Sequence, residues 1–523
     1  MVAGAVISSN PLKLDYRSHS KCLAICAVIT VSSFQYGLDY ALIGGFMAMP
    51  GFLQVFGYFD ETTRTWAIDT TVQQLISSLM TVGTFVGSLL IGPFSNRFGR
   101  KNGLWTASAL NAISTAIMMG TTTVGPLYFA RFLLGISVGW FLTFGQVYIN
   151  EAAPAHLRGI VFAVYQTQLS IGSVVGAAVD YGTHKMADKN AYRIPLALFF
   201  IAPTIQSISL IFFPESPRWL MAHGKEERSE SALRRLRSST IEEAAFQAEL
   251  NEIRISTRQQ VNQSKRNKKQ LWLEIWNKSN RRRTLLCIAV VCFHCAAGSS
   301  YLTIYTTYFL TTAGIPADRS FEFSTMITCM GLLGILSSFF WAEKVDRRAI
   351  FMIGVAFCGL TQLSFAITWT VTPGTETAGK AVVGLIAIFT FFYTAFGPYA
   401  WMVGAEYPNN HLRAHTFGLA TALNFLGNWI GIFTAPYFIN PASLGWSAKY
   451  GYIWFASNAI VFLFIYFFLP ETRGRTLEEI HEMFEERVPS RKFKGFLCAA
   501  TQAMAIEAIE KERNAHVEEA DTP

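Results

Sequence analysis

Apolar blocks of about 20 residues constrain the fold of this chain more than any other feature of its sequence. A helix of about 20 apolar residues is long enough to cross the hydrocarbon core of a bilayer. Twelve blocks stand out as candidate spans: 22–44, 70–93, 104–124, 127–150, 160–182, 194–213, 285–312, 321–342, 350–372, 380–405, 414–438 and 450–469. The sequence therefore predicts an all-α integral membrane protein.

The composition and the charge placement agree with this prediction. Only 15% of the 523 residues are charged and 51% are hydrophobic, whereas soluble domains carry about 25% charged residues. The net charge of +8 could suggest nucleic acid, but the basic residues lie in turns between apolar blocks, as topology signals do. We expect the lipid bilayer as a partner, no nucleic acid, and no obligate protein partner.

Lysine and arginine gather in the turns that follow even-numbered spans, whereas charges are few in loops such as 45–69 and 373–379. By the positive-inside rule, the basic turns, the central polar stretch and both termini face the cytosol. The predicted organisation is a cytosolic N-terminal segment, a six-helix bundle, a cytosolic linker with amphipathic helices, a second six-helix bundle and a cytosolic tail, over residues 1–21, 22–213, 214–284, 285–470 and 471–523.

The two predicted bundles repeat the same landmarks. Glu151 and Arg158 have the same spacing in "NEAAPAHLRG" as Glu406 and Arg413 have in "AEYPNNHLRA", and "PESPRW" near the end of the first half returns as "PETRGR" in the second. Two similar six-helix halves are typical of secondary transporters, whose binding site lies near the membrane midplane between the repeats. No phosphate-binding GxxxxGK[ST] loop is present.

These motifs also carry a family resemblance. "NRFGRK", "YINEAAPAHLRG", "PESPRWL", "EKVDRR", "GPYAWMVGAEYP" and "PETRGRT" together resemble the sugar porter family of the major facilitator superfamily. The last third is most similar to fungal alpha-glucoside and disaccharide permeases, and the chain as a whole also resembles hexose permeases. The resemblance implies two pseudo-symmetric bundles of six transmembrane helices and uptake of a sugar by alternating access.

Charged residues at the cytosolic ends of the spans are candidates for a gate. Carboxylate–guanidinium pairs that link the two bundles would hold the cytosolic side shut, since such pairs strengthen when water is excluded. The alternative is that the arginines only fix the topology. The residues are Arg97, Arg100, Glu151, Arg158, Glu215, Arg218, Glu343, Arg347, Arg348, Glu406, Arg413 and Glu471. Asn96 and Asp346 depart from the family pattern in the two basic turns.

Asp39 lies inside the first span, where an ionised carboxylate costs about 2.5–3.5 kcal/mol on insertion scales and needs a partner, a proton or a water-filled cavity. Arg131, early in the fourth span, is the natural partner. In proton-coupled members of the resembled family, an Asp and an Arg at these positions form the coupling pair. The alternative is a static buried ion pair that only tightens packing.

Six residues match sugar-contacting positions of that family, where amides bind hydroxyl groups and aromatic rings pack on the apolar face of a pyranose. They are Gln166, His294, Ser300, Tyr305, Trp401 and Asn424. The seventh span departs from the family because His294, Cys295 and Ser300 replace amides, which favours an altered or larger ligand. Each of the six could instead serve interhelical hydrogen bonding or core packing.

The leading hypothesis is a secondary active transporter that takes up an alpha-glucoside, disaccharide or hexose together with a proton. Another polyol-like solute (a sugar alcohol, quinate or a glycosylated metabolite) and a non-transporting sugar sensor are the alternatives. We expect no enzymatic activity, cofactor or metal site, because no nucleophile–base constellation or metal-ligand cluster stands out. The resemblance implies the plasma membrane.

Overall fold

The computed structural model describes residues 20–61, 64–153, 157–237, 243–264, 268–278, 280–341, 344–409, 412–473, 475 and 477–496. The predicted N-terminal segment therefore lies almost wholly outside the described residues, and so does the end of the predicted C-terminal tail. The chain forms two compact units, Met1–Lys265 with Ala317–Thr325, and Arg266–Pro316 with Met326–Pro523.

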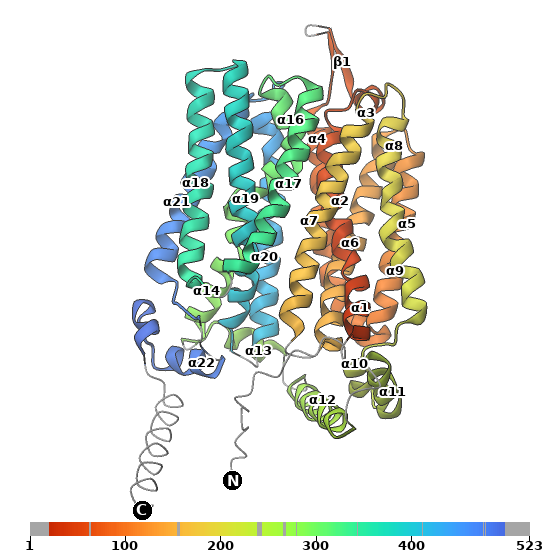
Figure 1. Cartoon of the computed structure of the whole chain (residues 1–523), viewed down its shortest axis with the longest axis vertical. Helices are drawn as coiled ribbons and strands as arrows, with labels where there is room; N and C mark the ends of the chain where they lie inside the picture. The colour runs from red at the N-terminus through yellow and green to blue at the C-terminus, as the bar shows by residue number, and fades with distance from the viewer. Residues whose placement is uncertain are drawn as a thin grey trace, which may run out of the picture. The chain divides into compact units, whose positions relative to one another are not determined.

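The first unit consists of helices and one small hairpin, drawn in red to yellow-green in Figure 1. Its elements are α1 (Ser20–Ile29), α2 (Val31–Phe46), α3 (Pro50–Phe56), β1 (Tyr58–Asp60), β2 (Thr65–Ala67), α4 (Thr70–Phe98), α5 (Arg100–Gly120), α6 (Val124–Ala152), α7 (Arg158–Thr183), α8 (Asn190–Ala197), the 3₁₀ turn Leu198–Phe200, α9 (Ile201–Phe212), α10 (Pro217–Ala222), α11 (Glu226–Leu236) and α12 (Glu243–Ser264).

The second unit is helical throughout its described part. Its elements are α13 (Lys268–Glu274), α14 (Arg281–Val291), α15 (Phe293–Ala296), α16 (Ser299–Thr312), α17 (Ala317–Trp341), whose first residues belong to the first unit, α18 (Arg347–Val371), α19 (Glu376–Glu406), α20 (Arg413–Ile439), the 3₁₀ turn Ser447–Tyr450, α21 (Gly451–Phe468), α22 (Leu477–Glu485) and the 3₁₀ turn Ser490–Gly495.

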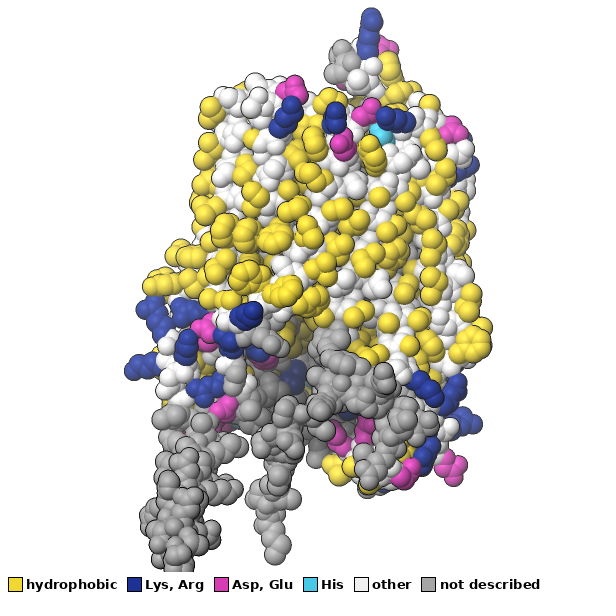
Figure 2. Space-filling model, viewed as in Figure 1, with side chains coloured by type: hydrophobic (Ala, Val, Ile, Leu, Met, Phe, Trp, Pro, Cys, Tyr) yellow, Lys and Arg dark blue, Asp and Glu magenta, His cyan; other side chains and the backbone are white. Residues whose placement is uncertain are grey.

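Every predicted span has a helix in the structure. Within the described residues, ten helical segments are long and apolar enough to cross a membrane, and the bent pair Arg281–Val291 with Phe293–Thr312 adds an eleventh. The remaining predicted span corresponds to α5, whose 21 residues are long enough to cross. Figure 2 shows hydrophobic side chains over the middle of the face in view and charged ones toward its two ends.

The structure differs from the sequence-based expectation in two places. The stretch 45–69, expected as a loop, contains α3 and an antiparallel hairpin in which Tyr58 pairs with Ala67. The seventh span is broken rather than continuous: α14 and the following helices are bent by 43°. Gly298, with a φ of +72°, lies within this span, and this left-handed conformation favours glycine.

Small residues allow α4 and α6 to pack backbone to backbone. A Cβ atom on Gly135 would overlap the carbonyl oxygen of Met80, and a Cβ atom on Gly83 would overlap that of Phe132. Close approach at small residues stabilises helix pairs in membranes, where no hydrophobic force drives helices together. This contact matters to function because α6 carries Arg131 and α4 carries a carbonyl that Arg131 contacts.

We therefore expect Gly135→Ala to destabilise the first unit by about 1–3 kcal/mol, the usual cost of overpacking. Gly125→Ala is the matched control, because a Cβ atom there has nothing within 4 Å. Thermal unfolding of the two purified variants in detergent measures the difference. A Gly135→Ala protein that melts at the same temperature as the control would contradict the packing argument.

Candidate functional site

Asp39 and Arg131 form a two-pronged ion pair inside the first unit. Arg131 Nη1 donates to Asp39 Oδ1, and Nη2 donates to Oδ2 at 3.2 Å. The third prong, Arg131 Nε, donates to the carbonyl oxygen of Ile76 on α4 at 2.9 Å. Both charged side chains are only 1% exposed. The structure therefore brings together the two residues that the sequence suggested as partners.

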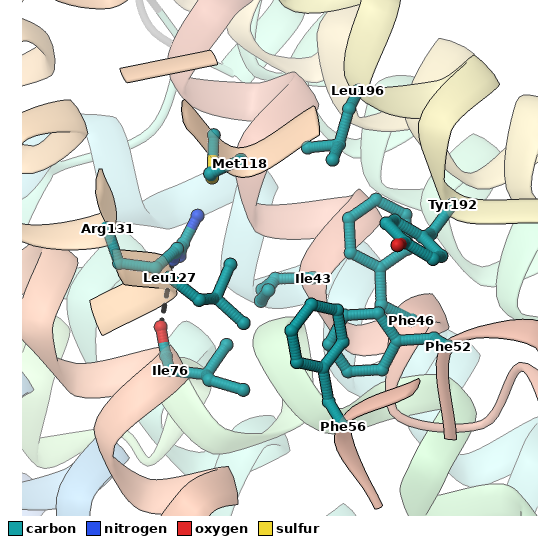
Figure 3. Close-up of a pocket in the computed structure, with 10 residues that line it drawn as sticks. All are labelled: Ile43, Phe46, Phe52, Phe56, Ile76, Met118, Leu127, Arg131, Tyr192 and Leu196. Carbon is teal, nitrogen blue, oxygen red and sulfur yellow. Dashed lines mark hydrogen bonds between the residues drawn. The ribbon is translucent and has the colours of Figure 1, made fainter. Parts of the chain in front are cut away.

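An apolar pocket adjoins the guanidinium of this pair. Figure 3 shows Arg131 at one side of the pocket, with its hydrogen bond to Ile76, and four aromatic rings at the other side. The rings of Phe52 and Tyr192 lie edge to face with centroids 5.5 Å apart. The lining residues are Ile43, Phe46, Phe52, Phe56, Ile76, Met118, Leu127, Arg131, Tyr192 and Leu196. Sequence reasoning did not identify this aromatic cover, contributed by α2, α3 and α8.

The chemistry of a buried ion pair suits proton exchange. Either charge alone would be costly in this apolar setting, whereas the pair is mutually compensated. If Arg131 moves away from Asp39, the carboxylate loses its counter-charge and a proton becomes the best available substitute. If the guanidinium returns, the proton is released. A buried pair of this kind can therefore exchange its counter-charge for a proton when the helices that carry its two members, here α2 and α6, move relative to each other.

In the second unit, His294 is held by two hydrogen bonds to α19. Its Nδ1 lies 2.6 Å from the hydroxyl of Tyr393, and its Nε2 lies 2.9 Å from the carbonyl oxygen of Gly397. Because a carbonyl oxygen can only accept, Nε2 carries the proton and Nδ1 accepts from Tyr393. Both ring nitrogens are thus occupied, so a sugar hydroxyl would have to displace Tyr393 to bind this ring.

Trp401 lies on α19 about two turns after Tyr393. Its ring is half-buried, with its centroid 5.5 Å from that of His294 and 6.1 Å from that of Phe417. Tyr393, Gly397 and Trp401 recur at helical spacing, so one stripe of α19 presents a hydroxyl, a backbone carbonyl and an indole. The structure therefore places the rings of His294 and Trp401 side by side and adds Tyr393 to them; their assignment to a substrate site stays a prediction.

Two asparagines one turn apart on α20 form a second polar group in this unit. Ser300 Oγ donates to Oδ1 of Asn428, a residue that sequence reasoning missed. Asn424 is 2% exposed, and its Oδ1 accepts no hydrogen bond from the described residues. Tyr305 is buried, and its hydroxyl donates to the carbonyl oxygen of Ile432 at 3.0 Å. Its assignment as a substrate residue stays a prediction. No described residue donates to the buried Oδ1 of Asn424, whereas the Tyr305 hydroxyl already donates to a carbonyl oxygen.

Gln166 is the one predicted sugar-contacting residue in the first unit. It lies half-buried on α7. Its assignment as a substrate residue stays a prediction.

Charged residues at one end of the first unit form a compact network. Arg100 grips Glu151 with two hydrogen bonds, from Nε at 2.9 Å and from Nη2 at 2.7 Å. Ser216 Oγ donates to the same carboxylate. Glu215 accepts from the backbone amides of Arg100 and Lys101 at the start of α5. Burial raises the pKa of Glu215, and the backbone amides that it binds oppose this rise.

The second unit repeats this network. Arg347 Nη1 donates to Glu406 Oε2, and Thr472 Oγ1 donates to the same oxygen at 3.1 Å. Glu471 accepts from the backbone amides of Arg347 and Arg348 at 3.2 and 2.9 Å. Serine and threonine therefore take equivalent places in the two units, as do the capping glutamates. The sequence repeat is thus reproduced at the level of individual hydrogen bonds.

The gate was expected to consist of pairs that link the two bundles, and the structure shows a different pairing. Arg100 with Glu151 lies entirely in the first unit, and Arg347 with Glu406 lies entirely in the second. The physical reason is proximity: each arginine begins the helix that follows a tight turn, next to the end of α6 or α19 in its own unit. These pairs therefore hold helices together within a unit.

The other predicted gate residues have varied surroundings. Arg97 is exposed and lies over the ring of Phe98, and no described carboxylate pairs with it. The buried Nε of Arg218 has no hydrogen-bond partner among the described residues. Arg413 acts electrostatically on Glu406. Arg158 begins α7, but its side chain lies outside the description, as does the whole of Glu343.

Apart from the aromatic cover of the pocket, the residues that sequence reasoning missed bind a residue that it had named. Tyr393 holds His294, Asn428 holds Ser300, and Ser216 and Thr472 hold the gate glutamates. The signal that could have found Tyr393 is its spacing from Trp401 on one helix. Within the part of the chain that the structure describes, no group of three or more histidine, cysteine or acidic residues could hold a metal ion.

Comparison with known proteins agrees with this architecture. The model of the family described as "Sugar (and other) transporter" matches residues 25–484. A galactose transporter of Saccharomyces cerevisiae is 26% identical, with 94% of this chain and 86% of the relative covered. A low-affinity glucose transporter of Kluyveromyces lactis is 28% identical, with 93% and 86% covered. The high glucose sensor RGT2 of Saccharomyces cerevisiae is 27% identical, with 92% and 63% covered.

Solved structures agree on the fold. The proton:xylose symporter XylE of the major facilitator superfamily superposes with a TM-score of 0.70 at 22% identity, with 89% of this chain and 99% of that chain covered. The prediction of a major facilitator fold is therefore confirmed. The resemblance to hexose permeases is confirmed as well, whereas the resemblance to alpha-glucoside permeases stays a prediction.

Proposed function

Because the chain belongs to the family of sugar and other transporters, we propose that this multi-pass membrane protein takes up a sugar together with a proton by alternating access. The observation that carries the proposal is the buried, two-pronged contact between Asp39 and Arg131. A carrier that only equilibrates its solute has no need of an ionisable pair in an apolar environment, because such a pair is costly to bury.

The polar groups of the second unit support a hydroxyl-rich solute. Trp401 offers a flat apolar surface beside the hydroxyl of Tyr393, and Oδ1 of Asn424 accepts a hydrogen bond from no described residue. Sugars present an apolar ring face and several hydroxyl groups, which these side chains complement. A hexose, a disaccharide or an alpha-glucoside are the solutes that we propose. A sugar alcohol, quinate or a glycosylated metabolite offers similar hydroxyl groups and is the other substrate class.

Uptake of radiolabelled sugars tests the proposal in a host that lacks its own hexose and disaccharide carriers. A panel of hexoses, disaccharides, alpha-glucosides and sugar alcohols identifies the solute. We expect accumulation against a gradient that collapses when a protonophore dissipates the proton gradient. Uptake that only equilibrates, with no response to the protonophore, would contradict proton coupling but leave a facilitated carrier.

Removing the indole of Trp401 should weaken substrate binding. We expect Trp401→Ala to raise the KM for uptake roughly five- to thirtyfold, which corresponds to about 1–2 kcal/mol of lost binding. Trp341→Ala is the matched control, because Trp341 is 47% exposed at the end of α17. Gln166→Ala should raise the KM as well. An unchanged KM in both site variants would remove Trp401 and Gln166 from the substrate site.

A sensor that signals without transport is the alternative function, since one relative is named a glucose sensor. The intact Asp39–Arg131 pair favours transport, because signalling by itself does not need proton exchange. Absence of uptake for every member of the sugar panel, in protein that binds one of them, would favour the sensor. We further propose the plasma membrane as the location and the cytosol for both termini, on the basis of the basic turns.

A further inference from the structure

A second carboxyl group of the first unit, Asp180 on α7, is buried without any partner that the structure describes. Its side chain is 2% exposed, and neither Oδ1 nor Oδ2 has a hydrogen-bond partner among the described residues. Asp39, in contrast, has both oxygens bound by Arg131. An ionised carboxylate without a counter-charge is one of the most costly groups to place in an apolar interior.

The position of Asp180 is fixed by the contact between α7 and α2. Asp180 lies one turn before the end of α7, and it packs against Gly45, near the end of α2. A Cβ atom on Gly45 would overlap Asp180 Oδ2, so the carboxyl group occupies the space that a side chain would fill. Figure 1 shows α2 and α7 side by side in the first unit. The carboxyl group is thus part of the helix contact itself.

The charged and titratable groups on the elements that pack around this end of α7 are engaged elsewhere or do not reach the carboxyl group. His184 contacts the carbonyl oxygen of Tyr181 and Asp318 Oδ1, Lys185 lies 3.6 Å from Asp318 Oδ2, and Arg319 pairs with Glu322. No described side chain of these elements donates a hydrogen bond to Asp180 or forms an ion pair with it. The charged and titratable residues on these elements are Asp39, Tyr40, Tyr181, His184, Lys185, Tyr192, Arg193, Asp318, Arg319 and Glu322.

We propose that Asp180 is a second proton-binding site of the first unit, and that its neutral, protonated form is the one that the α2–α7 contact accepts. This site is distinct from Asp39, because no arginine among the described residues compensates it. Removal of the proton would place an uncompensated charge against Gly45 and push the end of α2 away from α7. Since α2 also carries Asp39, the packing of the helix that holds the ion pair depends on the protonation of Asp180.

Infrared spectroscopy of the purified full chain tests the protonation directly. We expect the wild-type protein to show the carbonyl stretch of a neutral carboxylic acid at neutral pH, and Asp180→Asn to lose that band. Asp188→Asn, which changes an exposed carboxylate after α7, should retain it, and so should Asp39→Asn. Identical spectra of the wild type and Asp180→Asn in this region would show that Asp180 is ionised, and would overturn the proposal.

Thermal stability as a function of pH provides a second readout that does not depend on transport. Asparagine has the shape of the protonated acid but cannot ionise, so Asp180→Asn should melt near the wild-type temperature below a pH of about 4, where Asp180 is protonated in the folded and the unfolded chain alike. As the pH rises to neutral and above, Asp180 ionises in the unfolded chain but stays protonated in the folded one, so the wild type should lose stability relative to the variant. A parallel decline of the two proteins with pH would overturn the proposal.

A bound metal cation is the competing explanation for an unpaired buried carboxylate. Its effect on thermal stability can be distinguished from that of a proton. If sodium or potassium neutralised Asp180, either cation would raise the melting temperature of the wild type and not that of Asp180→Asn, which would overturn the proposal. If Asp180→Asn does not fold well enough to be purified, the wild-type protein alone can distinguish a proton from a metal cation. A loss of stability with rising pH that is the same in sodium, potassium and a bulky organic cation supports a proton, and cation-dependent stability contradicts it.

Discussion

Asp39→Asn is expected to abolish accumulation of the solute against its gradient, while exchange of solute across the membrane is partly retained. Asparagine keeps the shape of the side chain and still accepts a hydrogen bond from Arg131, but it cannot carry the proton. It also leaves the guanidinium buried without a counter-charge, which costs about 3–5 kcal/mol when a buried pair loses one partner. Uptake and counterflow of labelled solute, each with and without a proton gradient, measure the two effects separately.

The control variant Asp188→Asn changes an exposed acid outside the pair and should leave both activities unchanged. Asp39→Glu, which keeps an ionisable group, should retain some concentrative uptake and keep the protein folded if Asp39→Asn is too unstable to purify. Concentrative, pH-dependent uptake by Asp39→Asn at the wild-type level would refute the coupling role. The ion pair would then be a static element of packing.

Glu406→Gln should lower the maximal rate of transport roughly tenfold, with a smaller effect on the KM. The carboxylate of Glu406 collects hydrogen bonds from Arg347 and Thr472, and the two charged side chains are only 18% and 21% exposed. Neutralising one partner weakens this junction between the start of α18 and the end of α19. If the substitution removes about 1.4 kcal/mol of stabilisation from the transition state of the rate-limiting step, the rate falls tenfold. Initial rates at saturating solute measure it.

A double-mutant cycle separates the pair from general charge effects. If Arg347 and Glu406 act through each other, the double variant Arg347→Gln with Glu406→Gln should be no worse than the worse single variant. Arg97→Gln is the matched control, because Arg97 is exposed and pairs with no described carboxylate. Its effect should simply add to that of Glu406→Gln. Additive effects of Arg347→Gln and Glu406→Gln would contradict a direct coupling.

The Asp39–Arg131 pair could be predicted from the sequence, because a charged residue inside an apolar block needs a partner of opposite charge. Asp39 stands in an apolar block, and few residues in other blocks could neutralise it, so the amino-acid sequence alone identifies Arg131 as its partner. The cost of burying an unpaired charge in lipid leaves little choice of partner. The helical framework was predictable for the same reason, since block length and the basic turns determine where helices cross.

The pairing of the gate charges could not be predicted, because spacing along the chain does not say which carboxylate a flexible arginine reaches. The sequence offered several carboxylates near the cytosolic ends of the spans, and only the structure shows that Arg100 binds Glu151 in its own unit. The pairing is determined by the tight turn that places the start of α5 beside Glu215.

The role of His294 was also beyond sequence reasoning. The seventh span bends, and Gly298 adopts a left-handed conformation within it, so helical periodicity does not continue from α15 into α16. Residues before and after the break therefore face directions that a single helix would not give. His294 turns toward Tyr393, while Ser300 turns toward Asn428 on another helix.

The first and fourth spans are tied together in each unit, but by different chemistry. In the first unit α2 is joined to α6 through opposite charges, and in the second unit α15 is joined to α19 through neutral hydrogen bonds. Substitutions that alter the neutral contact in the second unit leave the charged pair of the first unit unchanged. The proposed substrate contacts of one unit can therefore vary while the proposed proton site of the other is kept.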